Sequence, residues 1–94
     1  MIDPLAARRA LDRAARACAI MSDELVAEVF ATLEARLHGD WAGTGPADSA
    51  GRELAYRQLR ALQDFKAEFA RMLSDGRVAE RDLANMGKGR LVQE

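Results

Sequence analysis

The sequence is poor in the residues from which catalytic and metal sites are built. It contains one cysteine, Cys18, and one histidine, His38, among 94 residues. A single cysteine excludes an internal disulfide and a zinc site with several cysteines, and a single histidine excludes a metal site with several histidines. Cys18 lies in an alanine-rich stretch, typical of a small buried apolar side chain. His38 precedes Gly39 and is typical of a last helical turn. We therefore expect no catalytic residue, no cofactor and no bound metal.

Neither sign of charge dominates, and long apolar runs are absent. The chain has 14 Lys and Arg against 15 Asp and Glu, a net charge of −1, whereas a dedicated nucleic-acid coat protein is strongly positive. The longest apolar run, Ala17 to Met21, is far shorter than the roughly 20 residues of a membrane span. No basic segment followed by an apolar one opens the chain, so we expect no secretory signal and a reducing compartment.

β-Branched residues are also few, which indicates an all-α fold. Eight Val, Ile and Thr stand against 11 Leu and 19 Ala, the strong helix formers of this composition. At this length we expect one small helical domain over residues 1–94. Because so many apolar residues are alanine, only 27 larger apolar side chains remain for its core. A core this small predicts that helix packing against a partner supplies part of the stability.

Capping residues predict the first two helices, over residues 4–21 and 22–38. Asp3 is a typical N-cap and Pro4 fits the first helical position. Ser22 is a second N-cap, which predicts a break or bend there, with one continuous helix as the alternative. Gly39 is the predicted end of the second helix.

Two further helices are predicted over residues 48–75 and 78–86. Asp48 caps the third helix after a connector rich in glycine, and Gly76 is its predicted stop. Arg52 and Glu53 are expected to hold the connector by hydrogen bonds to its backbone. The predicted architecture is a hairpin of the second and third helices, flanked by an N-terminal helix and a short C-terminal one.

An apolar seam on the third helix is the main candidate interface. Its members recur at a 3-4-3 spacing, typical of antiparallel pairing or a short coiled coil, and are buried either within the hairpin or between chains. Trp41 and Tyr56 are added as aromatic anchors, although Trp41 alternatively covers the apolar end of the hairpin. The seam consists of Leu62, Phe65, Phe69 and Met72, with Leu59 and Leu73 beside it.

Charge is distributed unevenly, and this leaves two other functions open. Residues 1–22 carry a net charge of +2 and residues 23–48 carry −5. A DNA-binding packaging or regulatory subunit would use the basic stripe or the tail from Lys88 to Arg90. An adaptor or inhibitor would use acidic residues of the second helix. The basic stripe is Arg8, Arg9, Arg13 and Arg16, and the acidic residues are Glu24, Glu28 and Glu34.

Residues 22–80 form a recognisable succession of an acidic helix, a tryptophan, a connector and a long helix. It resembles small proteins of tailed bacteriophages and prophages with the pattern W, T-P-x-D, R-E-x-L-(W/Y)-x-x-L-x-A-L. The resemblance implies a non-enzymatic virion or assembly protein in the virion or the host bacterial cytoplasm. Its implied partners are copies of itself or other phage structural proteins. The residues that carry it are Trp41, Thr44, Pro46, Asp48, Gly51, Arg52, Glu53, Leu54, Tyr56, Leu59, Ala61, Leu62 and the segment from Leu73 to Gly76.

Overall fold

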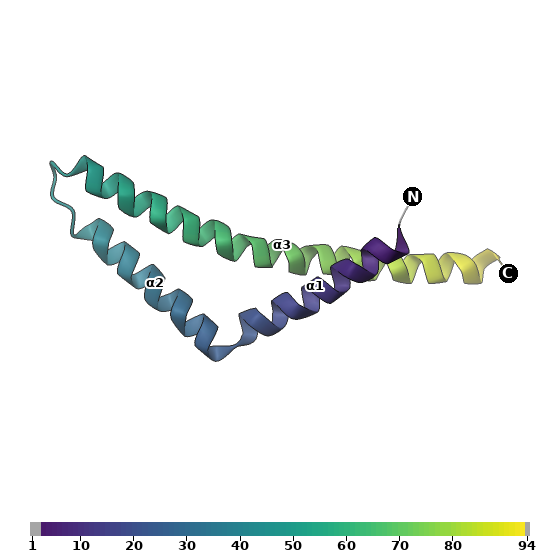
Figure 1. Cartoon of the computed structure of the whole chain (residues 1–94). Coiled ribbons are helices and arrows are strands. Elements are labelled where there is room, and N and C mark those ends of the chain that lie inside the picture. The colour runs from purple at the N-terminus through teal and green to yellow at the C-terminus, as the bar shows by residue number, and fades with distance from the viewer. Residues whose placement is uncertain (1–2, 94) are drawn as a thin grey trace. The chain divides into compact units, whose positions relative to one another are not determined.

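Three helices account for most of the structure. The computed structural model describes residues 3–93, and the side chains of residues 3–87. Within that range the chain forms α1 (Pro4–Ser22), α2 (Glu24–Ala42) and α3 (Ser49–Gln93) and no strand (Figure 1). The predicted all-α class is confirmed.

An aspartate caps the N-terminus of α1 and another caps that of α2. The Asp3 carboxylate accepts a hydrogen bond from the Leu5 amide at 3.0 Å. Asp23 has an extended backbone (φ −68°, ψ 125°) and its Oδ1 accepts from the amides of Leu25 and Val26 at 2.9 and 3.1 Å. The predicted break between the first two helices is therefore confirmed. The cap is Asp23 and not Ser22, because Ser22 still belongs to α1.

The prediction that α2 ends at Gly39 is wrong, because the helix continues to Ala42. The Gly43 amide donates to the Gly39 carbonyl at 2.9 Å, and the Thr44 hydroxyl donates to the Trp41 carbonyl at 2.7 Å. A glycine inside a helix lowers its stability by only about 1 kcal/mol relative to alanine. A glycine ends a helix when its backbone adopts a positive φ. No residue in the described range has positive φ. Trp41 consequently lies in the last turn of α2 and not in the connector.

Asp48 and Arg52 organise the connector as predicted. The Asp48 carboxylate accepts from the Gly51 amide at 2.9 Å and caps α3. The Arg52 Nη1 donates to the carbonyls of Gly45 and Pro46 at 2.7 and 3.3 Å. Glu53 has a different partner from the one predicted, because it forms an ion pair with Arg57, with 3.0 Å between Oε1 and Nε.

α3 passes through Gly76, so the predicted stop there and the separate short helix over 78–86 are both wrong. The helix has 45 residues, about 67 Å at 1.5 Å per residue. Gly76 is buried, and a Cβ placed on it would lie 2.2 Å from the Cβ of Ala14 on α1. Glycine is needed at this position because a second helix approaches closely, not because the chain turns.

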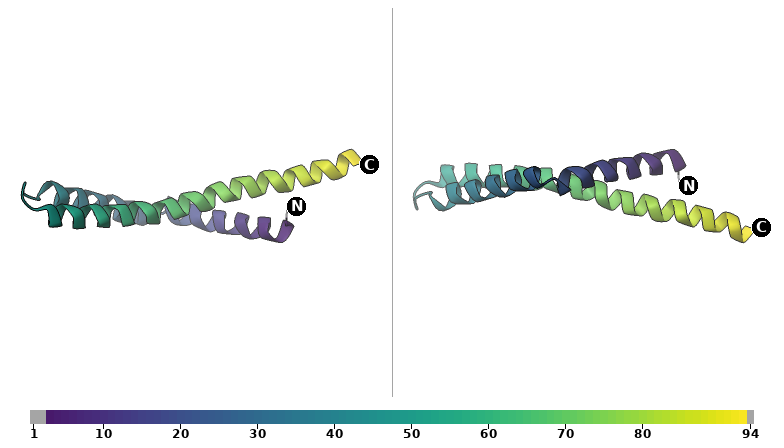
Figure 2. Two further views of the ribbon diagram at one scale, coloured as in Figure 1. Left: turned by 90° about the horizontal axis from the view of Figure 1, so that it is seen from above. Right: turned by 90° about the horizontal axis from the view of Figure 1, so that it is seen from below.

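Contacts divide the described residues into two units. Unit 1 consists of residues 3–20 and 69–93, in which α1 packs against the C-terminal part of α3. Unit 2 consists of residues 21–68, in which α2 packs against the N-terminal part of α3. Figure 2 gives two further views of the helices. The single domain over residues 1–94 stays a prediction.

The two units bury different side chains. Among the residues whose side chains the structure describes, those buried in unit 1 are all small: Ala7, Ala17, Gly76 and Ala79. Unit 2 buries Phe30 and Ala55 instead.

An aromatic pair and an ion pair join α2 to α3 in unit 2. The Phe30 ring centroid lies 5.9 Å from that of Phe65, and the Lys66 Nζ lies 5.7 Å from the Phe30 centroid. Lys66 also donates to the Glu34 Oε1 at 2.5 Å, and both of these side chains are largely covered. The ammonium group thus has a carboxylate and an aromatic face as partners.

In unit 2, the residues of α3 that are covered by α2 differ from those of the predicted seam. Phe65 is exposed, whereas the neighbouring Lys66 lies in the line of covered residues. A lysine is accommodated at a seam position here because Glu34 pairs with it and the Phe30 ring lies near its ammonium group. The covered line of α3 in this unit is Ala55, Leu59, Leu62 and Lys66.

Candidate functional site

The predicted interface residues divide into an exposed and a half-buried group. Trp41, Tyr56 and Phe65 are each more than half exposed in unit 2. Tyr56 also borders a groove of ≈ 220 Å³. The half-buried group is Leu59 and Leu62 in unit 2, and Phe69, Met72 and Leu73 in unit 1.

Much apolar surface stays uncovered. Sequence reasoning missed part of this surface, namely Leu5, Ile20, Leu25, Val29, Leu54 and Val78, each at least 44 % exposed.

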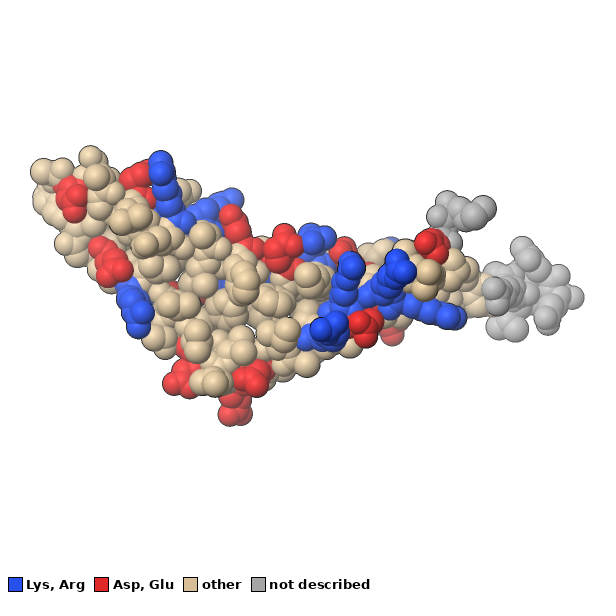
Figure 3. Space-filling view, viewed as in Figure 1, with Lys and Arg blue, Asp and Glu red and all other residues tan. Residues whose placement is uncertain are grey.

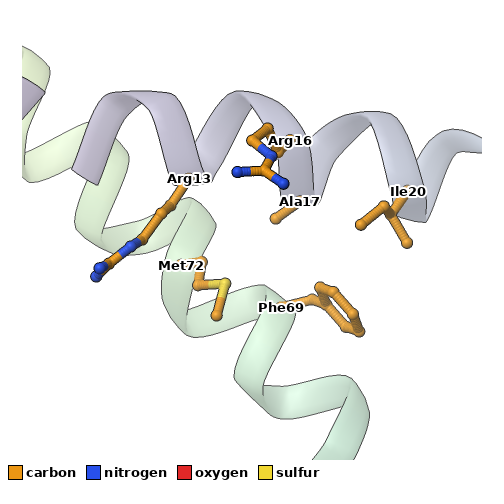
Figure 4. A pocket seen from close by; sticks show the side chains of 6 residues that line it. All are labelled: Arg13, Arg16, Ala17, Ile20, Phe69 and Met72. Carbon is orange, nitrogen blue, oxygen red and sulfur yellow. The ribbon is translucent and has the colours of Figure 1, made fainter. Parts of the chain in front are cut away.

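One open groove in unit 1 combines apolar and basic side chains. It has a volume of ≈ 280 Å³ and lies between α1 and α3. Figure 4 shows Ala17 and Ile20 pointing from α1 toward α3, with Phe69 and Met72 extending toward them. We call this site the arginine groove; its lining is Arg13, Arg16, Ala17, Ile20, Phe69 and Met72.

The arginine groove offers an apolar floor beside two positive charges. Within the described part of the chain, neither Arg13 nor Arg16 forms an ion pair or a side-chain hydrogen bond. The volume of ≈ 280 Å³ lies just below the roughly 300 to 1,000 Å³ that is typical of small-molecule sites. A site of this size and charge suits an apolar side chain flanked by carboxylates.

The predicted basic stripe is only partly included in this groove. All four arginines are exposed on α1, but Arg8 and Arg9 do not line the groove. Figure 3 shows Lys and Arg gathered over α1. The predicted tail contact falls on Lys88 and Arg90, whose side chains lie outside the described residues. Sequence reasoning missed Ile20, although it follows Arg13 and Arg16 at helical spacing.

A second charged surface lies at the start of α2. Figure 3 shows Asp and Glu gathered where this helix begins. Leu25 is 67 % exposed and Val29 is 49 % exposed. Glu24 and Glu28 are exposed beside them, and neither forms an ion pair or a side-chain hydrogen bond with described residues. We call these four residues the acidic stripe. Glu34, which the adaptor hypothesis also used, is instead paired with Lys66.

Cys18 and His38 are both exposed, so the predicted burial of Cys18 is wrong. His38 lies before the last turn of α2, since that helix continues to Ala42. Within the described residues, no group of three or more His, Cys, Asp and Glu side chains is placed to hold a metal ion.

No helix in the described part of the chain has both the length and the apolar character needed to cross a membrane.

No protein-family model, curated protein or solved structure matches the chain.

Proposed function

We propose that this chain is a non-enzymatic virion-structural or assembly protein of a tailed bacteriophage or prophage. It acts through helix-mediated contacts with copies of itself and with other phage structural proteins, in the virion or the host bacterial cytoplasm. The likeness of residues 22–80 to phage proteins supports the setting. The helical fold and its uncovered apolar side chains support the mode of action.

The observation that carries the proposal is the contrast between what is buried and what is exposed. Alanines make up most of the buried residues, whereas Trp41, Leu54, Tyr56 and Phe65 are exposed in unit 2. Aromatic and leucine side chains are effective anchors when a partner removes them from water. These exposed side chains are the ones that we propose a partner covers.

Self-association is tested by sedimentation equilibrium of the full chain from low to high micromolar concentration. We expect the average mass to rise above that of the monomer, and thermal unfolding to shift upward with concentration. A mass that stays at 10.3 kDa, with unfolding independent of concentration, would contradict the proposal.

The phage setting has a separate test in purified particles. Particles produced by the phage or lysogen that encodes the chain are separated on a density gradient and analysed by peptide mass spectrometry. We expect the chain to be found with intact particles or with their assembly intermediates. Its absence from both would contradict the virion or assembly role.

DNA binding is the second candidate, supported by four exposed arginines on α1. Phosphate contacts weaken steeply with salt, so DNA-binding activity would show a strong salt dependence that decreases in an Arg9→Gln, Arg13→Gln, Arg16→Gln variant. With a net charge of −1, we expect no measurable duplex binding near physiological salt. Sub-micromolar, salt-sensitive binding would favour this candidate over the first.

A further inference from the structure

We infer that the arginine groove of one copy binds the acidic stripe of a second copy. This inference rests on the proposed self-association and names the two surfaces that carry it. The groove contributes two guanidinium groups and an apolar floor. The stripe contributes two carboxylates and two exposed apolar side chains on α2.

Charge selects this partner. Arg13 and Arg16 are three residues apart on α1, and Glu24 and Glu28 are four residues apart on α2. Each pair therefore spans one helical turn, with about 5 to 6 Å between Cβ atoms. Two arginine–glutamate pairs can form in parallel along the docked helix, and all four groups lack a partner among the described residues.

The apolar parts also match. Leu25 and Val29 are one turn apart and lie next to the two glutamates on α2. Ile20 is 44 % exposed and borders the groove beside Phe69 and Met72. Docking the stripe removes apolar surface from water on both sides, which favours association. The ion pairs then fix the direction and register of the docked helix.

Contact between two unlike surfaces has a consequence for assembly. Each copy presents a groove and a stripe, so two copies can bind each other reciprocally, or a copy that binds one neighbour through its groove can offer its stripe to another. Such contacts form a closed ring when the rotation between copies closes, and a filament when it does not. Symmetric pairing through one shared patch would instead stop at a dimer.

Charge reversal on each surface tests the inference. The groove variant is Arg13→Glu, Arg16→Glu, and the stripe variant is Glu24→Arg, Glu28→Arg. We expect each variant alone to self-associate on the order of 100-fold more weakly, because like charges then face each other. Arg8→Glu, Arg9→Glu is the matched control, since it changes the charge of α1 equally but outside the groove, and it should associate like the natural chain.

Mixing the two variants is the decisive measurement. In an equimolar mixture the reversed groove faces the reversed stripe, so we expect sedimentation to show assembly restored to within about tenfold of the natural chain. Circular dichroism checks that each variant is helical. If the natural chain assembles but the groove variant assembles equally well, or mixing restores nothing, the inference is wrong and the proposed function stands. A natural chain that never assembles contradicts the proposed function itself.

Discussion

Units 1 and 2 each pair two helices, but they use different side chains to do so. Unit 1 brings Gly76 and Ala14 into close approach and buries alanines. Unit 2 buries Phe30 close to the Lys66 ammonium group, and the ion pair of Lys66 with Glu34 joins its helices. Small residues allow the two helix backbones of unit 1 to approach closely. Dispersion contacts between the backbones then stabilise the unit in place of large buried side chains. We therefore expect the stability of unit 1 to fall when a substitution adds atoms between its helices. We expect the stability of unit 2 to fall when a substitution removes atoms from its buried side chains.

The largest expected effect is that of Phe30→Ala in unit 2. Phe30 is 9 % exposed, and truncation of a buried phenylalanine costs about 3 to 5 kcal/mol. Phe65→Ala is the matched control, because its ring is exposed and its loss removes only about 1 kcal/mol of aromatic pairing. Urea unfolding at a fixed low concentration measures both. Equal losses would show that Phe65 is covered in solution.

Gly76→Ala tests unit 1 in the opposite sense, by adding one methyl group. Its Cβ would lie 2.2 Å from that of Ala14, and overpacking of this kind costs about 1 to 3 kcal/mol, of which the better helix propensity of alanine offsets up to about 1 kcal/mol.

Gly87→Ala, on the same helix, is the control for that variant. A Cβ placed on Gly87 would have no atom of the described neighbouring side chains within 4 Å. We expect the control to raise stability by up to about 1 kcal/mol through helix propensity. Thermal unfolding should therefore shift down for one variant and up for the other. An upward shift for both would show that α1 does not approach Gly76 closely.

The smallest expected effect is that of the ion pair between Lys66 and Glu34 in unit 2. Its side chains are 37 % and 28 % exposed, so solvent screening limits the coupling energy to about 1 kcal/mol. A double-mutant cycle with Lys66→Met and Glu34→Gln measures it, and added salt should reduce it. For comparison, the more exposed pair of Arg60 and Asp64 should show a smaller coupling. A larger coupling there would contradict the view that partial burial strengthens the pair.

The capping residues were the most predictable part of the fold. Asp3, Asp48 and the break before α2 follow from short-range hydrogen bonding, which depends on neighbouring residues alone. Gly39 and Gly76 were mispredicted as stops because a glycine that ends a helix and a glycine that permits close packing look alike in sequence. Only knowledge of α1 as the packing partner distinguishes the two roles of Gly76.

The candidate site was partly predictable for a similar reason. The arginines on α1 and the seam residues Phe69 and Met72 were identified by their spacing, but their meeting in one groove depends on how α1 and α3 pair. Lys66 was left out of the seam because apolar patterns ignore lysine. Its position becomes interpretable only when Glu34 is placed opposite.

The makeup of unit 1 has a consequence for the order in which the chain folds. Unit 2 is continuous in sequence, whereas unit 1 joins residues on either side of it. Local contacts form sooner because they close shorter loops. During synthesis at about 5 to 20 residues per second, α1 waits several seconds for its partner segment of α3. Its future contact face is mostly alanine, which loses little by exposure to water and offers other nascent chains little to adhere to.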